Sequence, residues 1–164
     1  MDETCENTNV INDLNIPIIC MGCKDMVIAA ASDGILVSDK PRSSYIKPFV
    51  EQVEGEARFA EKSWGSFTIL DVQPEATTIR IILNAGNRLT YHSHEHRDEV
   101  WTIVSGTGRT IVDGAERRVR PGDVVTMPSG CKHTLIADTA IQAIEVQIGE
   151  EITVADKQKY PLDL

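Results

Sequence analysis

The chain has 164 residues, of which 41% are hydrophobic and 25% are charged, and its formal net charge at pH 7 is -9. This length allows one hydrophobic core with a smaller appendage. The acidic balance argues against binding to nucleic acid or to an anionic membrane, because both are polyanions. The first residues are acidic, and the most apolar early stretch, 16–31, is interrupted by Lys24-Asp25. Neither segment resembles a signal peptide or a membrane span, so we expect a soluble cytoplasmic protein.

The first part of the chain, residues 1–56, has a pattern of its own. Three short strands separated by turns are predicted at 18–20, 25–31 and 34–38. Residues 41–54 show a weak helical spacing of apolar side chains, and 54–58 has the composition of a linker. These patterns predict a small N-terminal extension of strands and a short helix.

From residue 64 onward the pattern is typical of β-structure. Strands are predicted at 64–72, 77–83, 89–94, 99–105, 109–112, 117–120, 124–127, 134–137 and 141–148. Short strands joined by regular turns, such as Asp113-Gly114, indicate a closed β-sandwich or barrel. We therefore predict an all-β protein with a single β-barrel over residues 57–149 and a C-terminal tail over 150–164.

Two of the four cysteines, Cys20 and Cys23, have the spacing of a redox pair or of half a zinc site. The sequence contains no second pair with this spacing, and its histidines are grouped elsewhere. The alternative is that reduced cysteines flank a tight turn, and we favour it for a cytoplasmic protein.

All four histidines lie within two short stretches of the sequence. His92 and His94 are two residues apart, so their side chains share one face of an extended strand. A turn at Arg97-Asp98 is predicted to return Glu99 opposite these histidines in a hairpin. His133 follows a later turn and opens another strand.

These side chains together predict a metal site. Three imidazoles and one carboxylate suit a divalent first-row metal with open positions for water or substrate. We therefore predict one divalent metal ion (zinc, manganese, cobalt, nickel or iron) as the cofactor. Its predicted ligands are His92, His94, Glu99 and His133.

The two stretches resemble the two signature motifs of the cupin superfamily. The first, from Gly86 to Gly106, has the form G-x5-HxH-x4-E-x6-G, and the second, from Gly122 to His133, has the form G-x5-PxG-x2-H. Every fixed position is filled, and Ala137 stands where an asparagine often ends the second motif. The resemblance implies a jelly-roll-like barrel around one metal ion. Many cupins bind ligands without catalysis, so a non-catalytic sugar- or metal-binding module is an alternative.

The chain also resembles the C-terminal part of bifunctional mannose-1-phosphate guanylyltransferase/mannose-6-phosphate isomerase enzymes. The matching segments are 22–38, 64–70, 88–89, 94–101, 104–107 and 144–147. The first of these resembles the end of the family's nucleotidyltransferase portion. The glycine-rich nucleotide loop and the large α/β domain of that portion are absent from these residues. The resemblance therefore implies no guanylyltransferase activity for this chain alone, and it makes a separate nucleotidyltransferase chain a candidate partner.

Two departures from this family concern the isomerase site. Members commonly read Q-M-H-H-H-R-A-E-H-W where residues 92–101 read HSHEHRDEVW, so His92 replaces a glutamine. The family's C-terminal arginines, in D-I-V-R-F and Y-G-R, have no counterpart in segments 152–155 and 160–162. Because arginine is suited to holding a phosphate, their loss predicts a weak or altered isomerase activity.

The resemblance implies aldose–ketose isomerisation of a sugar phosphate through an enediolate, whose charge a metal stabilises. His96 is the candidate base and Arg97 the candidate contact to phosphate or enediolate, so these are the predicted catalytic residues. Arg88, Lys132 and Glu145 are predicted to contact the substrate.

Other interpretations of these patterns remain open. His96 could be an exposed turn residue, and Arg97 could form a loop salt bridge to Asp98 or Glu95. Three histidines and one glutamate also serve Fe(II)-dependent dioxygenases among the cupins, which is a less favoured alternative. We also expect a homodimer, because short exposed β edges need covering.

Overall fold

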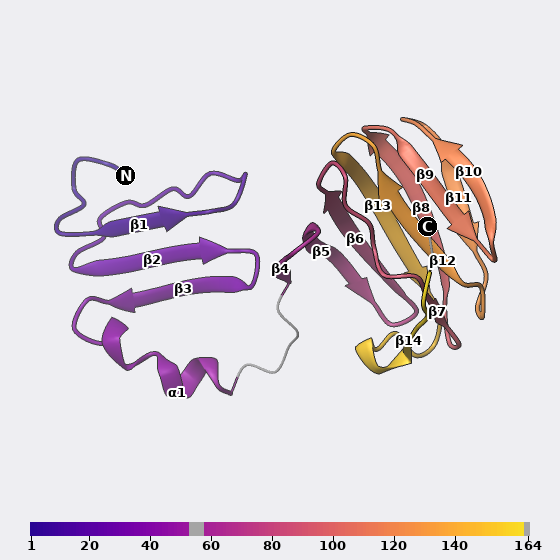
Figure 1. Cartoon of the computed structure of the whole chain (residues 1–164). Coiled ribbons are helices and arrows are strands. Elements are labelled where there is room, and N and C mark those ends of the chain that lie inside the picture. The colour runs from indigo at the N-terminus through magenta and orange to yellow at the C-terminus, as the bar shows by residue number, and fades with distance from the viewer. Residues whose placement is uncertain (53–57, 163–164) are drawn as a thin grey trace. The chain divides into compact units, whose positions relative to one another are not determined.

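The structure is a computed structural model that describes residues 1–52 and 58–162. The chain divides into two compact units, Met1–Arg58 and Phe59–Leu164 (Figure 1). The domain boundary expected between residues 56 and 57, and all of the expected linker except Arg58, lie outside the described residues. Within the described residues, no helix has the length and apolar character needed to cross a membrane.

The first unit contains a three-stranded sheet in the order β1-β2-β3. β2 (Met26–Ala31) pairs in parallel with β1 (Asn9–Asn12) and antiparallel with β3 (Gly34–Asp39). The predicted strands at 25–31 and 34–38 are thereby confirmed. The strand predicted at 18–20 is wrong, because this segment joins no sheet, and the carbonyl of Cys20 instead accepts the backbone N–H of Asp2. β1 has the sequence NVIN, which shows no apolar alternation, and only its pairing with β2 reveals it.

The helical pattern at 41–54 forms only two short pieces, a 3-10 turn (Ser43–Tyr45) and α1 (Lys47–Val50). Neither has a side-chain cap, and the apolar side chains of α1 are exposed, with Phe49 at 68%. Among the described residues of this unit, the buried hydrophobic ones are Cys20, Ile28 and Ala30. The unit therefore has only a small core of its own. All four cysteines of the chain are free.

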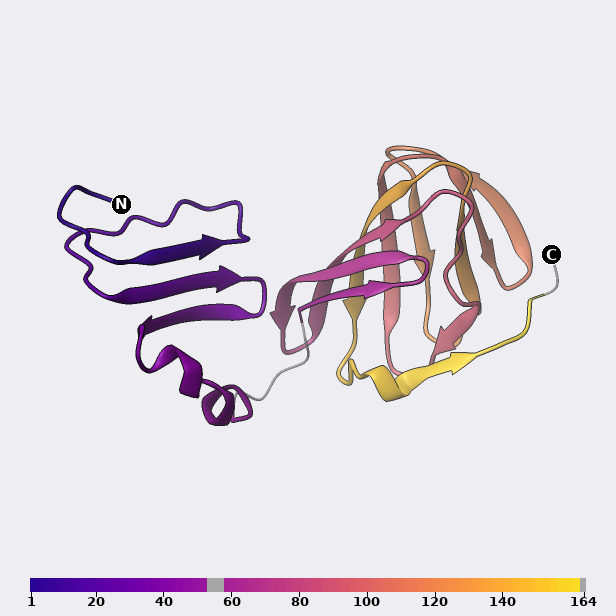
Figure 2. The ribbon, with the colours of Figure 1, turned by 60° about the vertical axis from the view of Figure 1, so that its left-hand side comes forward.

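The second unit consists of two antiparallel sheets that face each other (Figures 1 and 2). The six-stranded sheet, in the order β11-β8-β13-β6-β5-β4, contains β4 (Phe59–Lys62), β5 (Gly65–Gln73), β6 (Ala76–Leu83), β8 (Asp98–Ser105), β11 (Val124–Met127) and β13 (Ile141–Ile148). The five-stranded sheet, in the order β10-β9-β12-β7-β14, contains β7 (His92–His94), β9 (Gly108–Val112), β10 (Ala115–Val119), β12 (His133–Ala137) and β14 (Lys157–Lys159). The fold is all-β, with the jelly-roll architecture that the sequence predicts.

The core of this unit lies between the two sheets, and β13 shows how it is divided. Its inward side chains alternate with outward ones, as expected for a strand with one buried face. The inward residues change from Ile141 and Ala143 at one end to Glu145 and Gln147 at the other, and all four are buried. One end of the barrel interior is therefore apolar, and the other is polar.

The hairpin predicted between the first two histidines and Glu99 does not form. β7 pairs with β12 and β14, whereas β8 pairs with β11 and β13 in the opposite sheet. β7 has only three residues, and the chain leaves it at residues 95–97 to cross to the other sheet. Glu99 therefore reaches the histidines from across the barrel rather than from a neighbouring strand.

Two strands of this unit were not expected from the sequence. β4 precedes the predicted start of the β pattern, and β14 lies in the segment that was expected to be a tail. β14 forms the edge of the five-stranded sheet and pairs with all three residues of β7. The C-terminal segment is therefore hydrogen-bonded, through β14, to the strand that carries two of the histidines.

Candidate metal centre

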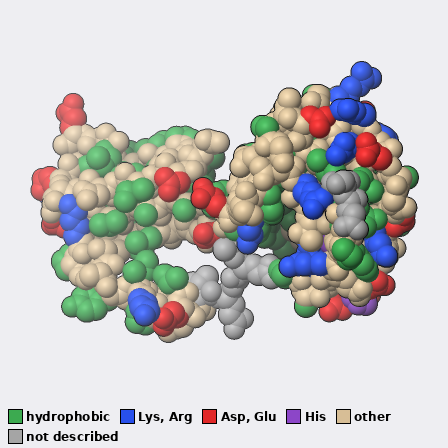
Figure 3. Space-filling view, in the orientation of Figure 1, with side chains coloured by type: hydrophobic (Ala, Val, Ile, Leu, Met, Phe, Trp, Pro, Cys, Tyr) green, Lys and Arg blue, Asp and Glu red, His purple; other side chains and the backbone are tan. Residues whose placement is uncertain are grey.

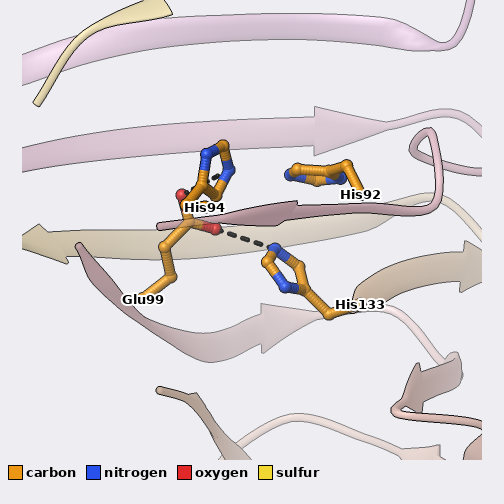
Figure 4. Close-up of side chains that lie close together, drawn as sticks. All are labelled: His92, His94, Glu99 and His133. Atoms are coloured by element: carbon orange, nitrogen blue, oxygen red, sulfur yellow. Dashed lines mark hydrogen bonds and ion pairs between the residues drawn. The ribbon is translucent and has the colours of Figure 1, made fainter. Parts of the chain in front are cut away.

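The four predicted ligands meet at the polar end of the barrel. His92 and His94 lie on β7, and His133 opens β12 in register with His92. Glu99 projects from β8 in the facing sheet, and Figure 4 shows all four side chains turned toward one another. Their ligand atoms lie within 4.8 Å of one another, and each residue is at most 4% exposed. The sequence prediction that these residues gather is confirmed.

Backbone carbonyls select the tautomer of two of the rings. Nδ1 of His92 lies 2.6 Å from the carbonyl oxygen of Thr90, and Nδ1 of His133 lies 3.0 Å from that of Cys131. A carbonyl can only accept a hydrogen bond, so both Nδ1 atoms carry a proton. In the neutral rings Nε2 then carries no proton and has a free lone pair, and a ring in this state can bind a metal.

The short distances between Glu99 on one sheet and two histidines on the other indicate whether a cation fits between them. Nε2 of His133 lies 3.0 Å from Oε2 of Glu99, and Nε2 of His94 lies 3.2 Å from Oε1 of the same carboxylate. With His133 neutral and protonated at Nδ1, its pair with Glu99 brings two lone pairs together, which is unfavourable unless a proton or a metal ion is shared between them. Imidazole and carboxylate are common ligands of divalent transition metals. The donor set therefore fits one such ion.

Arg97 contacts the centre rather than the loop beside it. The residue is 8% exposed, and its Nε donates to Oε1 of Glu99 at 2.9 Å. Its terminal nitrogens lie 3.1 Å from Nε2 of His94 and 2.9 Å from the carbonyl oxygen of Thr153. The alternative of a loop salt bridge to Asp98 or Glu95 is not what this side chain forms.

Asp156, just before β14, holds the loop of residues 95–97 that follows β7. Its carboxylate accepts hydrogen bonds from the backbone N–H groups of Glu95 and His96, at 2.9 and 3.3 Å. It also lies 3.8 Å from Nδ1 of His94 and 3.9 Å from the guanidinium of Arg97. Nδ1 of His94 has no hydrogen-bond partner among the described residues, so Asp156 acts on this ring through its charge and through the loop that it holds. Sequence spacing could not reveal this residue, because it is about 60 positions from its partners.

A buried polar chain extends from the centre into the barrel. Nε1 of Trp101 donates to Oε2 of Glu145 at 2.7 Å, and the amide of Gln147 donates to Oε1 of Glu145 at 2.7 Å. The same amide reaches Oε1 of Glu99 at 3.2 Å. Burial, together with the nearby charge of Glu99, raises the pKa of Glu145 to about 7. For Glu99 burial acts against the charge, but in the metal-free protein a proton shared with Nε2 of His133, together with the guanidinium of Arg97, lowers its pKa.

The histidines predict how the stability of the metal-free protein depends on pH. Burial is the main cause that lowers the pKa of His92 to about 3 and that of His94 to about 4. Below about pH 6.5 the unfolded chain protonates both rings and the folded chain does not. Each histidine therefore lowers the free energy of unfolding by about 1.4 kcal/mol for each unit by which the pH falls. Glu145 acts oppositely, because its folded carboxyl takes up a proton near pH 7 and its unfolded one only near 4.5. We therefore expect the free energy of unfolding of the metal-free protein to fall by about 1.4 kcal/mol between pH 6 and pH 5.

Urea unfolding of the metal-free protein at pH 6 and pH 5 measures this loss. A Glu145→Gln variant lacks the opposing carboxyl, so its stability should fall about twice as steeply over the same interval. A parent protein that becomes more stable as the pH falls would contradict the predicted charge states.

The remaining predicted site residues lie at different distances from the centre. His96 is exposed and lines a surface cleft of about 610 Å³ whose wall includes Glu95, Asp98 and Glu150. Arg88 contacts the carbonyl oxygen of Leu162 at 3.5 Å, and Nζ of Lys132 lies 4.3 Å from the ring centre of Tyr160. The structure thus brings Arg97 and Glu145 to the centre, places His96 on the surface, and sets two cations beside the last residues.

Residues 79–147 match the cupin domain family. The mannose-1-phosphate guanylyltransferase of Escherichia coli K12 is 25% identical over 164 residues, which cover 94% of this chain and 34% of that protein. The alginate biosynthesis protein AlgA of Pseudomonas aeruginosa is 24% identical over 148 residues, covering 85% of this chain and 31% of that protein. The chain therefore spans about a third of the length of these curated relatives.

Solved structures show the same fold. An RmlC-like cupin from Shewanella frigidimarina superposes with a TM-score of 0.53 at 23% identity, covering 60% of this chain and 86% of that one. The buried ligand set lies on the strands and turns of the matched cupin segment. Residues 79–147 thus match the cupin domain family, and most of the chain is similar to about a third of a mannose-1-phosphate guanylyltransferase.

Proposed function

We propose that this chain is a metal-dependent cupin that interconverts the aldose and ketose forms of a sugar phosphate. The observation that carries the proposal is the buried group of three imidazoles and one carboxylate, with free Nε2 lone pairs on two of the rings. The relatives support the substrate class, because their name describes an enzyme that acts on mannose 1-phosphate. The proposed reaction is the conversion of mannose 6-phosphate to fructose 6-phosphate.

Each group around the centre has a defined part in this proposal. A divalent ion held by the four ligands would stabilise negative charge on the neighbouring oxygens of an enediolate. Arg97 is buried against two of the ligands, so its guanidinium can orient a further anionic oxygen there. Glu145 is inside the barrel with a pKa near 7, which suits a group that moves a proton between adjacent carbons. His96 remains the candidate base predicted from the sequence.

The test is to load the protein separately with Co(II), Mn(II), Zn(II) and Fe(II) and to assay this conversion. We expect turnover with at least one metal. Arg97→Ala should lower kcat/KM by about 10- to 100-fold, because a hydrogen bond to a charged group is lost. Arg118→Ala is the matched control, since this arginine is 79% exposed and pairs with Asp138 on the surface. Comparing Glu145→Gln with His96→Gln identifies the proton carrier.

Absence of turnover with every metal, in protein shown to be fully loaded, would contradict the isomerase proposal. The non-catalytic sugar- or metal-binding module is then the better account, and it is favoured by the very low exposure of the four ligands. Calorimetry with mannose 6-phosphate distinguishes binding without turnover from no binding. Oxygen consumption by the Fe(II)-loaded protein tests the dioxygenase alternative.

We also propose that the first unit mediates assembly, either as a homodimer or with a separate nucleotidyltransferase chain. Its sheet carries exposed apolar side chains, such as Ile35 at 64% and Val37 at 62% on β3. Exposed apolar strands of this kind favour contact with another chain. Sedimentation at micromolar concentration tests the dimer, which a monomeric result would contradict.

A further inference from the structure

The register of β14 places two lysines beside the metal centre. β14 runs antiparallel to β7, with Lys157 opposite His94 and Lys159 opposite His92. Directly opposed residues of antiparallel strands project their side chains on the same face of the sheet. Both lysines therefore share the sheet face of the two histidine ligands, and Gln158 lies on the other face with Ser93.

Both lysines are open to a ligand. Each is exposed, and within residues 1–52 and 58–162 neither takes part in an ion pair. Partial burial lowers the pKa of Lys157, while the charges of Glu145 and Glu99 act to raise it. The ammonium group therefore lies close enough to the barrel interior to interact with these two carboxylates. Neither lysine is held in an ion pair with a described residue, so both side chains provide positive charge next to the centre.

The charge around this strand is unusual for an acidic chain. Lys132 contacts Tyr160 and Arg88 contacts Leu162, so two further cations lie against the residues that follow β14. Figure 3 shows Lys and Arg side chains spread over the visible face of the second unit, although the net charge of the chain is -9. The cleft beside His96, in contrast, is lined by four carboxylates and one cation, the buried Arg97. An anion is therefore attracted to the face of the lysines and repelled from that cleft.

We propose that Lys157 and Lys159 bind the phosphate of a phosphorylated sugar whose other end reaches the metal centre. Neighbouring strands lie about 4.8 Å apart, so both lysine side chains begin one strand away from the histidine ligands and on the same face. This inference rests on the proposed function for its ligand, and it names the group that recognises the phosphate.

Calorimetry on the metal-loaded full chain tests the proposal, with inorganic phosphate, mannose 6-phosphate and mannose as probes. The variants are Lys157→Met, Lys159→Met and their combination, which remove the charges but keep much of the side-chain volume. Lys62→Met is the matched control, because this exposed lysine lies on β4 in the same unit. The double variant should bind both phosphate probes about 10- to 100-fold more weakly than the parent. Mannose binding, metal content and the Lys62→Met variant should match the parent, and Lys157→Arg should restore phosphate binding in part.

Unchanged phosphate affinity in the double variant would overturn the proposal, as would an equal loss for mannose. A loss of metal would also overturn it, because the lysines would then act on the centre itself. The outcome is separable from that of the isomerase assay. Lysine-dependent phosphate binding without turnover supports this inference and contradicts the proposed reaction. Turnover and phosphate binding that do not depend on the lysines support the reaction and contradict this inference.

Discussion

A His133→Ala variant is expected to lose metal binding, with an affinity at least 100-fold below that of the parent. Replacing a residue that merely supports a ligand costs about 10- to 100-fold, and His133 supplies a ligand atom itself. The change also leaves Oε2 of Glu99 without the nitrogen that lies 3.0 Å away. Metal content after dialysis, measured by plasma mass spectrometry, checks this result.

The same variant should lose the rise in melting temperature that metal gives the parent. A ligand that binds only the folded state stabilises it by an amount that grows with ligand concentration over Kd. His96→Ala is the control, because this histidine is the exposed one and lies outside the buried group. It should retain both the metal and the thermal shift. Full metal content in His133→Ala, or loss of metal in His96→Ala, would contradict the ligand assignment.

Trp101→Ala is expected to lower the free energy of unfolding by about 3–5 kcal/mol, the usual cost of removing a fully buried aromatic side chain. Trp101 is 0% exposed and packs with the core of the barrel. Its ring centre also lies 5.3 Å from that of His133, and its N–H donates to Glu145. Urea unfolding of the metal-free variant measures the loss.

Two further variants separate the contributions of this tryptophan. Trp101→Phe keeps most of the buried surface and removes the donor to Glu145, so it should cost about 1–3 kcal/mol. Trp64→Ala should cost less than Trp101→Ala, because Trp64 is only partly buried against the same core. Equal losses at both tryptophans would show that Trp101 is not central to the packing.

The longer strands and the ligand set could be predicted because their signals are local. β13 alternates buried and less buried residues over its whole length, and both of its ends match the prediction for 141–148. The spacing of His92 and His94 requires only that a strand be extended. Such patterns depend on backbone geometry within a few residues, and tertiary contacts did not override them here.

The short strands and the supporting residues could not be predicted because they depend on distant partners. β14 has the sequence KQK, which resembles a charged tail, and its strand conformation follows from pairing with β7. The contacts of Asp156 with the loop after β7 depend on the same pairing. The predicted hairpin failed for a related reason, since no local signal shows that the chain crosses between sheets after three residues. Register over such separations is set by the whole barrel.

The most direct test of the metal centre is a crystal structure of the protein grown with Zn(II), with diffraction data collected above the zinc absorption edge. The account predicts one anomalous peak among the four side chains, about 2.0–2.2 Å from Nε2 of the histidines and from a carboxylate oxygen of Glu99. A structure without a peak between these residues, or with the zinc bound only elsewhere, would contradict it.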